Sequence, residues 1–252
     1  MLAAGRGPDD PMAKAFGVTN KCFIPVAGIP MLSRVVQALD ESGMVMKPVV
    51  VTEAHERALD LLPNNVLITL PAQSAPGSVL LSLGSGAVSL PLLVTTGDHA
   101  LLTPQMVRYF LGKAAASDAD FCAGLATAET ILAAYPQSVR TFFRLGPDRV
   151  SGCNLFAIRS PRGLAIIERW QYLEQLRKKP WRLISALGPG PLLQFVLGRL
   201  TLDKAFAMVS RKLGLVAKPV LMPFAEAAID VDKPADKELA ELILARRNAT
   251  LH

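Results

Sequence analysis

The sequence predicts an α/β fold with a mixed, mainly parallel sheet. Three near-continuous apolar runs, at residues 48–52, 66–70 and 92–96, carry this prediction. Such runs are typical of strands that are buried on both faces, as in parallel sheets. Helical patterns at residues 31–41, 55–62 and 78–83 alternate with them. Strands that alternate with helices predict a sheet covered by helices rather than an all-β or all-α domain.

The elements that follow are predicted from local start and stop signals. Thr103 and Pro104 open a helix that runs to about residue 117, with Thr as N-cap and Pro at the first helical position. Gly214 ends a later helix as its C-cap. The remaining predictions are strands at 121–125, 142–145, 155–158, 220–222 and 228–231, helices at 161–179, 201–213 and 234–247, and a break at 188–191.

Composition excludes several classes of protein. The 252 residues are 51% apolar and 19% charged, which excludes a disordered chain. The net charge of +6 suits anionic ligands but is too small for a dedicated nucleic-acid binder, so we expect no nucleic-acid partner. Cys22, Cys122 and Cys153 are too few and too scattered for a disulfide framework. The sequence has no CxxC motif, so we expect no structural zinc site. Reduced thiols favour a cytoplasmic location.

Three segments bear on membranes. Residues 61–97 carry no charge, but Pro, Gly and Asn interrupt them too often for a spanning helix, so we expect no transmembrane segment. The N-terminus lacks the apolar stretch of a signal peptide. Basic residues predominate at 159–218, where they form a solvated helical face, one wall of an anionic-substrate cleft or a surface for anionic lipid.

The N-terminal sequence LAAGRG, at residues 2–7, is the most informative motif. Glycines let a backbone approach a phosphate closely, and their N–H groups can cradle it. No GK[ST] follows, so the motif is not a P-loop, and Asp10 stands where a dinucleotide-binding fingerprint has its third glycine. Lys21 comes next, and PVAGIPML follows at residues 25–32.

These motifs, with VTTGD at residues 94–98 and IDVDKP at 229–234, resemble the MobA-like nucleotidyltransferases. That group belongs to the wider family of sugar-phosphate and polyol-phosphate nucleotidyltransferases. The resemblance implies a three-layer α/β/α sandwich like that of GT-A glycosyltransferases. We expect one domain over residues 1–252, with a nucleotide-binding half at 1–126 and an acceptor-binding half at 127–252.

The resemblance also implies a reaction and its partners. An NTP and a phosphorylated small-molecule acceptor, a sugar phosphate or a polyol phosphate, would give an NDP-linked product and pyrophosphate. The acceptor phosphate would attack the α-phosphorus directly. Lys21 and Asp98 would be catalytic, and Mg²⁺ would be the cofactor. The nucleotide would be bound by Leu2, Ala3, Ala4, Gly5, Arg6, Gly7, Lys21, Gly77 and Ser78.

Each of these residues has a structural alternative. Lys21 would approach the phosphates as a point charge, or it is a surface lysine. Asp98 follows an apolar strand, where α/β sheets bind ligands, and with Asp230 or Asp232 it would supply the carboxylates that Mg²⁺ prefers. Alternatively, Asp98 caps the following turn, and one of the other two caps the helix that starts at Pro234.

Further candidates lie beside these segments. Gly77 and Ser78 would contact the base, or only form a turn and helix cap. Asn154 would bond an acceptor hydroxyl, or be structural. We expect Cys153 to be a packed residue rather than a nucleophile, because no His is near in sequence. His99 would contact phosphate or acceptor, or make local hydrogen bonds.

Two features depart from the family pattern. Only Met1 and Leu2 precede the AAG of the first strand, so we expect a natural start upstream or marginal stability there. Asp9 and Asp10 follow the glycine turn and would repel a triphosphate unless they point away, and Lys14 would replace a missing cation.

Two other functions stay open. One is nucleotidyl transfer to the molybdenum cofactor, although the basic segment 159–218 favours another acceptor. The other is a non-catalytic nucleotide- or sugar-phosphate-binding protein. The sequence leaves the base, the acceptor and the oligomeric state undetermined.

Overall fold

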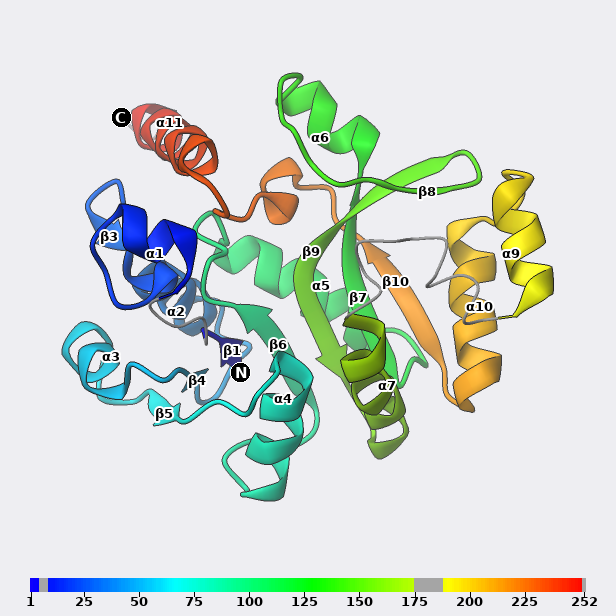
Figure 1. The fold of residues 1–252 in the computed structure, drawn as a ribbon, viewed down its shortest axis with the longest axis horizontal. Coiled ribbons are helices and arrows are strands. Elements are labelled where there is room, and N and C mark those ends of the chain that lie inside the picture. The colour runs from blue at the N-terminus through cyan, green and yellow to red at the C-terminus, as the bar shows by residue number, and fades with distance from the viewer. Residues whose placement is uncertain (5–8, 175–187, 251–252) are drawn as a thin grey trace. The chain divides into compact units, whose positions relative to one another are not determined.

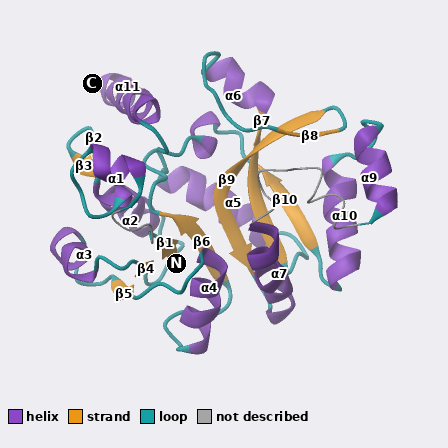
Figure 2. Ribbon diagram, in the orientation of Figure 1, coloured by secondary structure: helices purple, strands orange, loops and turns teal. Residues whose placement is uncertain are grey.

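The computed structural model describes residues 1–4, 9–174 and 188–250, and strands alternate with helices along most of the chain (Figures 1 and 2). The chain divides into two compact units. Unit 1 comprises Met1–Val88, Val94–Tyr109 and Ile229–His252, and unit 2 comprises Ser89–Leu93 and Phe110–Ala228. The predicted single domain and its two halves stay a prediction.

Unit 1 contains a parallel sheet in which β1 lies between β4 and β6, and β5 pairs with β4. Its strands are β1 (Leu2–Ala3), β4 (Val49–Val51), β5 (Leu67–Thr69) and the end of β6 (Leu92–Thr96). The three valines of β4 are all buried, as expected for a strand covered on both faces. The short hairpin of β2 (Pro25–Val26) and β3 (Ile29–Pro30) lies outside this sheet.

The helices of unit 1 follow its strands along the chain. They are α1 (Pro11–Ala15), α2 (Met31–Glu41), α3 (His55–Leu61), α4 (Ala75–Gly84), the start of α5 (Pro104–Ala115) and α11 (Pro234–Thr250), with a 3₁₀ turn η1 (Lys21–Phe23). Helix α2 buries Met31, Leu32, Val35, Val36 and Leu39, which recur on one face at helical spacing. The Thr103 hydroxyl accepts from the Met106 amide and caps α5 as predicted.

Unit 2 contains strands in both directions. Strand β7 (Phe121–Thr127) pairs in parallel with β10 (Ala217–Leu221) and antiparallel with β9 (Asp148–Ile158), which also pairs antiparallel with β8 (Phe143–Leu145). Its other elements are α6 (Ala128–Ala134), η2 (Pro161–Gly163), α7 (Leu164–Glu174), α9 (Pro189–Val196), α10 (Leu202–Leu213) and η3 (Ala225–Ala228). Across both units the strand pairing is mixed and mainly parallel, which confirms the predicted fold class.

Several predicted boundaries are wrong. The expected strand at residues 228–231 is absent from the described chain, because Ala228 ends the 3₁₀ turn η3 and residues 229–231 have no regular secondary structure. The expected break at 188–191 is instead the start of α9, where a proline occupies the first turn. The strand expected at 155–158 is only the end of β9. The helix expected at 161–179 is described only as η2 and α7, and the rest lies outside the described residues. Gly214 does end α10, with φ 68°.

Among the described residues, no helix combines the length and apolar character needed to cross a bilayer.

Gly97, the first residue after β6, is closely surrounded by side chains. Its amide donates to the Ala3 carbonyl at 3.0 Å. A Cβ at this position would lie 2.9 Å from Cys22 Sγ, 3.1 Å from Ala4 Cβ and 3.2 Å from Leu32 Cδ1. Glycine therefore lets the end of β6 approach β1 and the Lys21 turn.

We predict that Gly97→Ala lowers the free energy of unfolding by about 1–3 kcal/mol, because an added methyl group has no room in a packed interior. Urea denaturation measures the change. Gly112→Ala, in α5, is the matched control, since a Cβ there meets nothing within 4 Å. It should be neutral or stabilising, because alanine favours a helix. Equal stability of Gly97→Ala and the wild type would contradict the prediction.

Candidate functional site

The first strand leads directly to the candidate nucleotide turn. Leu2 and Ala3 form β1, and the Ala4 amide donates to the Val51 carbonyl at 3.0 Å. Leu2 and Ala4 are buried, whereas Ala3 is half-buried. Because β1 is parallel to both neighbours, its carboxyl end lies beside those of β4 and β6, where ligands bind in such sheets. Gly5, Arg6 and Gly7 lie outside the described residues.

Asp98 follows the neighbouring strand β6 and is held by backbone contacts. The Val231 amide donates to the Asp98 carbonyl at 3.2 Å, which fixes the segment before α11 against the end of β6. The side chain of Asp98 is only 14% exposed. This carboxylate is therefore presented at the carboxyl end of the sheet with little access to water.

Lys21 lies at the centre of the candidate site. It is the first residue of η1 and is only 2% exposed. Its Nζ donates to Asp98 Oδ2 at 2.6 Å and to Asp232 Oδ1 at 2.7 Å. Lys21 is not the surface lysine of the alternative interpretation, because its ammonium bridges two carboxylates from distant parts of the chain.

Two opposing effects act on the pKa of Lys21. Burial disfavours the charged amine and lowers the pKa, whereas the charges and hydrogen bonds of Asp98 and Asp232 raise it. The carboxylates dominate, so the pKa of Lys21 lies above its usual value. The side chain is therefore an ammonium at neutral pH and supplies a fixed positive charge.

The structure separates the two late aspartates. Asp232 pairs with Lys21 and remains 60% exposed on its side chain. The turn into α11 is stabilised by Asp236, whose Oδ2 accepts from the Asp232 and Lys233 amides at 3.2 and 3.1 Å. Asp236 was not predicted from the sequence, although an acid in the first turn of a helix, which can accept from the amides just before that helix, is a recognisable start signal. Asp232 is thus the late aspartate that joins Asp98.

Asn20 is a second residue that the sequence analysis missed. It is fully buried, and its Oδ1 accepts from the Cys22 amide at 2.8 Å, which caps η1. Its Nδ2 donates to the Ala4 carbonyl at 2.6 Å and to Glu53 Oε1 at 2.8 Å. Asparagine is a preferred N-cap residue, so its place directly before Lys21 was the available signal.

Gly77 and Ser78 lie in the first turn of α4. The Gly77 amide donates to the Ser74 hydroxyl at 3.1 Å, and Ser78 Oγ donates to the Ser74 carbonyl at 3.0 Å. Ser78 Oγ also accepts from the Ala72 amide. Both residues thus belong to the first turn of α4, which Ser74 caps, and a contact with the base stays a prediction.

The acidic residues after the glycine turn are engaged locally. Asp10 Oδ1 accepts from the Met12 and Ala13 amides and caps α1. Asp9 pairs with Lys14 at 2.9 Å, and both side chains are exposed. Lys14 therefore pairs with Asp9 and not with the carboxylates that bind Lys21, and its predicted role as a replacement cation stays a prediction.

Asn154 and Cys153 belong to unit 2. Asn154 adopts φ 48° within β9, opposite the point where the pairing of β7 and β9 shifts register. Asparagine tolerates this left-handed conformation better than most residues, and such bulges redirect a side chain. Cys153 is fully buried in the core, as predicted for a packed residue. His99, in unit 1, is also fully buried.

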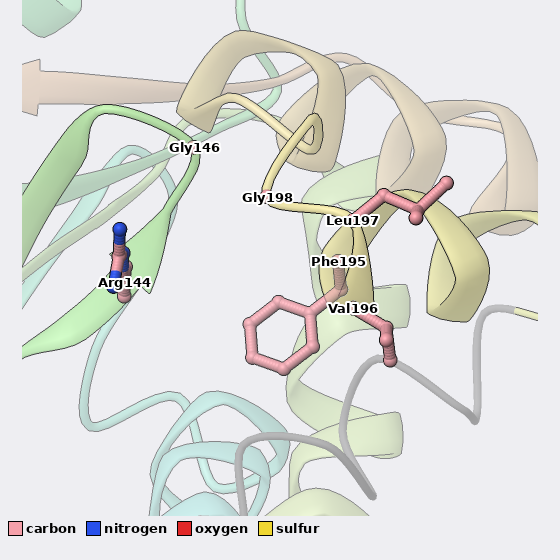
Figure 3. Close-up of a pocket in the computed structure, with 6 residues that line it drawn as sticks. All are labelled: Arg144, Gly146, Phe195, Val196, Leu197 and Gly198. Carbon is pink, nitrogen blue, oxygen red and sulfur yellow. The ribbon is translucent and has the colours of Figure 1, made fainter.

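A cavity of about 320 Å³ lies in unit 2 (Figure 3). Arg144 and Gly146 line it from the β8–β9 hairpin, and residues 195–198, at the end of α9, line it opposite. None of these residues was a predicted site residue.

Comparisons with known proteins agree with the motifs. The model of the MobA-like NTP transferase domain matches residues 1–140. A 2-C-methyl-D-erythritol 4-phosphate cytidylyltransferase of Rhodococcus opacus (strain B4) is 30% identical over 115 residues, which are 42% of this chain. The chain spans about half of that relative, 51% of its length.

Two solved structures share the fold. One, described as a hypothetical transferase from Thermus thermophilus, is 30% identical, with a TM-score of 0.79 over 94% of this chain and 99% of that chain. The other, a CMP:2-keto-3-deoxy-manno-octonic acid synthetase complexed with CTP, is 14% identical, with a TM-score of 0.58 over 98% and 97% of the two chains. With more than half of its residues matched by the family model, this chain belongs to the MobA-like NTP transferase domain family.

Proposed function

We propose that the protein is an Mg²⁺-dependent nucleotidyltransferase that transfers NMP from an NTP to a phosphorylated small-molecule acceptor. The observation that carries the proposal is the buried ammonium of Lys21, held by Asp98 and Asp232 at the carboxyl end of a parallel sheet. Family membership supports the same reaction class. A sugar phosphate or a polyol phosphate is the proposed acceptor.

The reaction exchanges one phosphorus–oxygen bond for another. An oxygen of the acceptor phosphate forms a bond to the α-phosphorus of the NTP. The bond from that phosphorus to the bridging α–β oxygen breaks, and pyrophosphate leaves with the electron pair. Negative charge shifts onto the α-phosphoryl oxygens and the leaving group, so catalysis depends on alignment and on fixed positive charge.

The residues at the end of β1 and in η1 suit these tasks. Leu2, Ala3 and Ala4 would carry the turn of Gly5, Arg6 and Gly7 to the triphosphate, where backbone N–H groups and one guanidinium bind it. Lys21 would move its ammonium from the carboxylates toward the phosphates, where it stabilises the developing charge. Because Lys21 remains protonated, it acts as an electrostatic group and not as a general base.

Asp98 and Asp232 fit an Mg²⁺ site by their chemistry. Mg²⁺ is usually bound by one or two carboxylates, completed by phosphate oxygens and water. Both carboxylates face the same ammonium, so they can face a shared cation. When bound there, Mg²⁺ would draw charge from the phosphoryl oxygens. Asp230 remains a further candidate ligand because it lies two residues from Asp232.

The base and acceptor subsites are less closely defined. Gly77 and Ser78, at the start of α4, are the proposed base-side residues. Asn154 is the proposed acceptor-side residue, supported by its left-handed backbone at an irregularity of β9.

Pyrophosphate release tests the proposed activity. The purified protein is incubated with Mg²⁺, each of four NTPs and a panel of sugar phosphates and polyol phosphates. The first pair is CTP with 2-C-methyl-D-erythritol 4-phosphate, which the name of the Rhodococcus relative suggests. We expect release only with one nucleotide and a phosphorylated acceptor together. Nucleotide binding without release for any pair would instead favour a non-catalytic binding protein.

We predict that Asp98→Asn lowers kcat about a hundredfold or more, since loss of a metal ligand removes several kcal/mol of transition-state stabilisation. Steady-state pyrophosphate release at limiting Mg²⁺ measures it. Asp60→Asn is the matched control, because Asp60 is exposed and pairs only loosely with Arg57, at 3.6 Å. An Asp98→Asn enzyme that is folded and as active as the control would disprove the role.

We predict that Lys21→Met binds Mn²⁺ about tenfold more tightly than the wild type when no nucleotide is present. The ammonium occupies both carboxylates and competes with a cation, so its removal frees them. Electron paramagnetic resonance of free Mn²⁺ measures the affinity. Lys47→Met, at an exposed lysine, should leave it unchanged. Unchanged or weaker Mn²⁺ binding by Lys21→Met would show that the carboxylates do not share a metal.

A further inference from the structure

Asn20 makes a set of contacts that uses its whole side chain. An amide has two N–H donors and one carbonyl acceptor. Nδ2 faces the Ala4 carbonyl and the Glu53 carboxylate, which only accept, and Oδ1 faces the Cys22 amide, which only donates. These partners also fix which side-chain atom is nitrogen. The side chain is fully buried, so water replaces none of these contacts.

The contacts join three segments of unit 1. Ala4 directly follows β1, and its carbonyl accepts from Asn20 at 2.6 Å. Cys22 belongs to η1, the turn that begins with Lys21. Glu53 follows β4. One buried amide thus links the end of β1 with the backbone that carries the Lys21 ammonium.

We propose that Asn20 is a positioning residue that fixes the distance between the end of β1, at Ala4, and the turn that carries Lys21. This inference rests on the proposed function, in which the end of β1 and Lys21 both belong to the triphosphate site. A triphosphate bound at two points requires those points to be held at one separation. Residues that orient a binding group in this way commonly change activity when they are replaced, although they touch no substrate.

The chemistry of asparagine explains why other caps would not serve. Serine also caps a helical turn and can accept from the Cys22 amide, but it is too short to reach Ala4 as well. Aspartate has the same shape but would place a carboxylate oxygen against the Ala4 carbonyl and Glu53 Oε1. The link to Ala4 therefore requires the donor that only the amide supplies here.

The Asn20→Ser variant tests the bond to Ala4 separately from the cap of η1, because serine can keep the bond from the Cys22 amide but cannot reach the Ala4 carbonyl. We expect it to remain folded but with a lowered melting temperature, because the Ala4 carbonyl loses a buried donor, so binding and rates are measured well below the unfolding transition. We expect kcat/KM for the NTP and the affinity for a non-hydrolysable NTP analogue, measured by calorimetry, both to fall about 10–100-fold. Mn²⁺ binding without nucleotide should not change. Asn65→Ser, at an exposed asparagine of the same unit, is the matched control.

The Glu53→Ala variant tests whether the contact of Asn20 with Glu53 or the contact with Ala4 is the positioning contact. It removes one acceptor of Nδ2 and leaves the bond to Ala4, so we expect less than a threefold change in analogue affinity. If Glu53→Ala equals Asn20→Ser, the Ala4 link is not the positioning contact. If Asn20→Ser binds and turns over like Asn65→Ser, or loses activity only in proportion to its folded fraction, the proposal is overturned.

The same measurements distinguish failure of the proposed function from failure of the positioning role of Asn20. A wild type that binds the analogue but transfers no NMP to any acceptor contradicts the proposed activity, and the binding ratio still decides the role of Asn20. A wild type that binds no nucleotide overturns both. Normal wild-type turnover with no effect of Asn20→Ser overturns the positioning role alone.

Discussion

The charge of Lys21 is the constraint on which the candidate site depends. A lysine that is 2% exposed loses nearly all hydration of its ammonium, and this loss is tolerated only if anionic partners replace the water. Asp98 and Asp232 are those partners. Removing either one would leave an incompletely paired charge, so the three side chains are interdependent. The same arrangement keeps two carboxylates close together without strong repulsion.

This ion pair network brings together residues that are far apart in the chain. Asp98 lies 77 residues from Lys21, and Asp232 lies 211 residues away. The bond from the Val231 amide to the Asp98 carbonyl sets the position of the late segment, and Asn20 sets that of the Lys21 turn. Fixed charges at known separations are what phosphoryl transfer requires, because the reaction is accelerated mainly by alignment and electrostatics.

The regular elements of the fold could be predicted because burial and capping require particular residue types within a few positions of one another in the sequence. The valines of β4, the spaced apolar residues of α2 and the Thr-Pro start of α5 each specify their structure over a few residues. The segment at 228–231 was predicted wrongly, since a short apolar run such as Ile229 to Val231 suits a buried irregular segment as well as a strand. The left-handed backbone of Asn154 was likewise invisible, because it depends on the register of β7 against β9.

The site was predictable in part. Family motifs identified Lys21 and Asp98, but the sequence could not distinguish Asp230 from Asp232, since both occur in one Asp-x-Asp pattern and only tertiary contacts separate them. Asp236 was missed because its partners are backbone groups, which every residue has, and Asn20 because only tertiary contacts bring it to Ala4 and Glu53. The cap of η1 by Asn20 was nonetheless a local signal that could have been used.

The central claim is that a buried, permanently charged Lys21 organises the site, and NMR of lysine side-chain ammonium groups tests it most directly. With ¹⁵N-labelled protein at neutral pH, a carboxylate-bound ammonium should give a resolved signal with slow hydrogen exchange, absent from Lys21→Met. This signal should shift when Mg²⁺ and a non-hydrolysable NTP analogue are added together. A Lys21 signal that exchanges as fast as those of exposed lysines, or that ignores Mg²⁺ and nucleotide, would contradict the account.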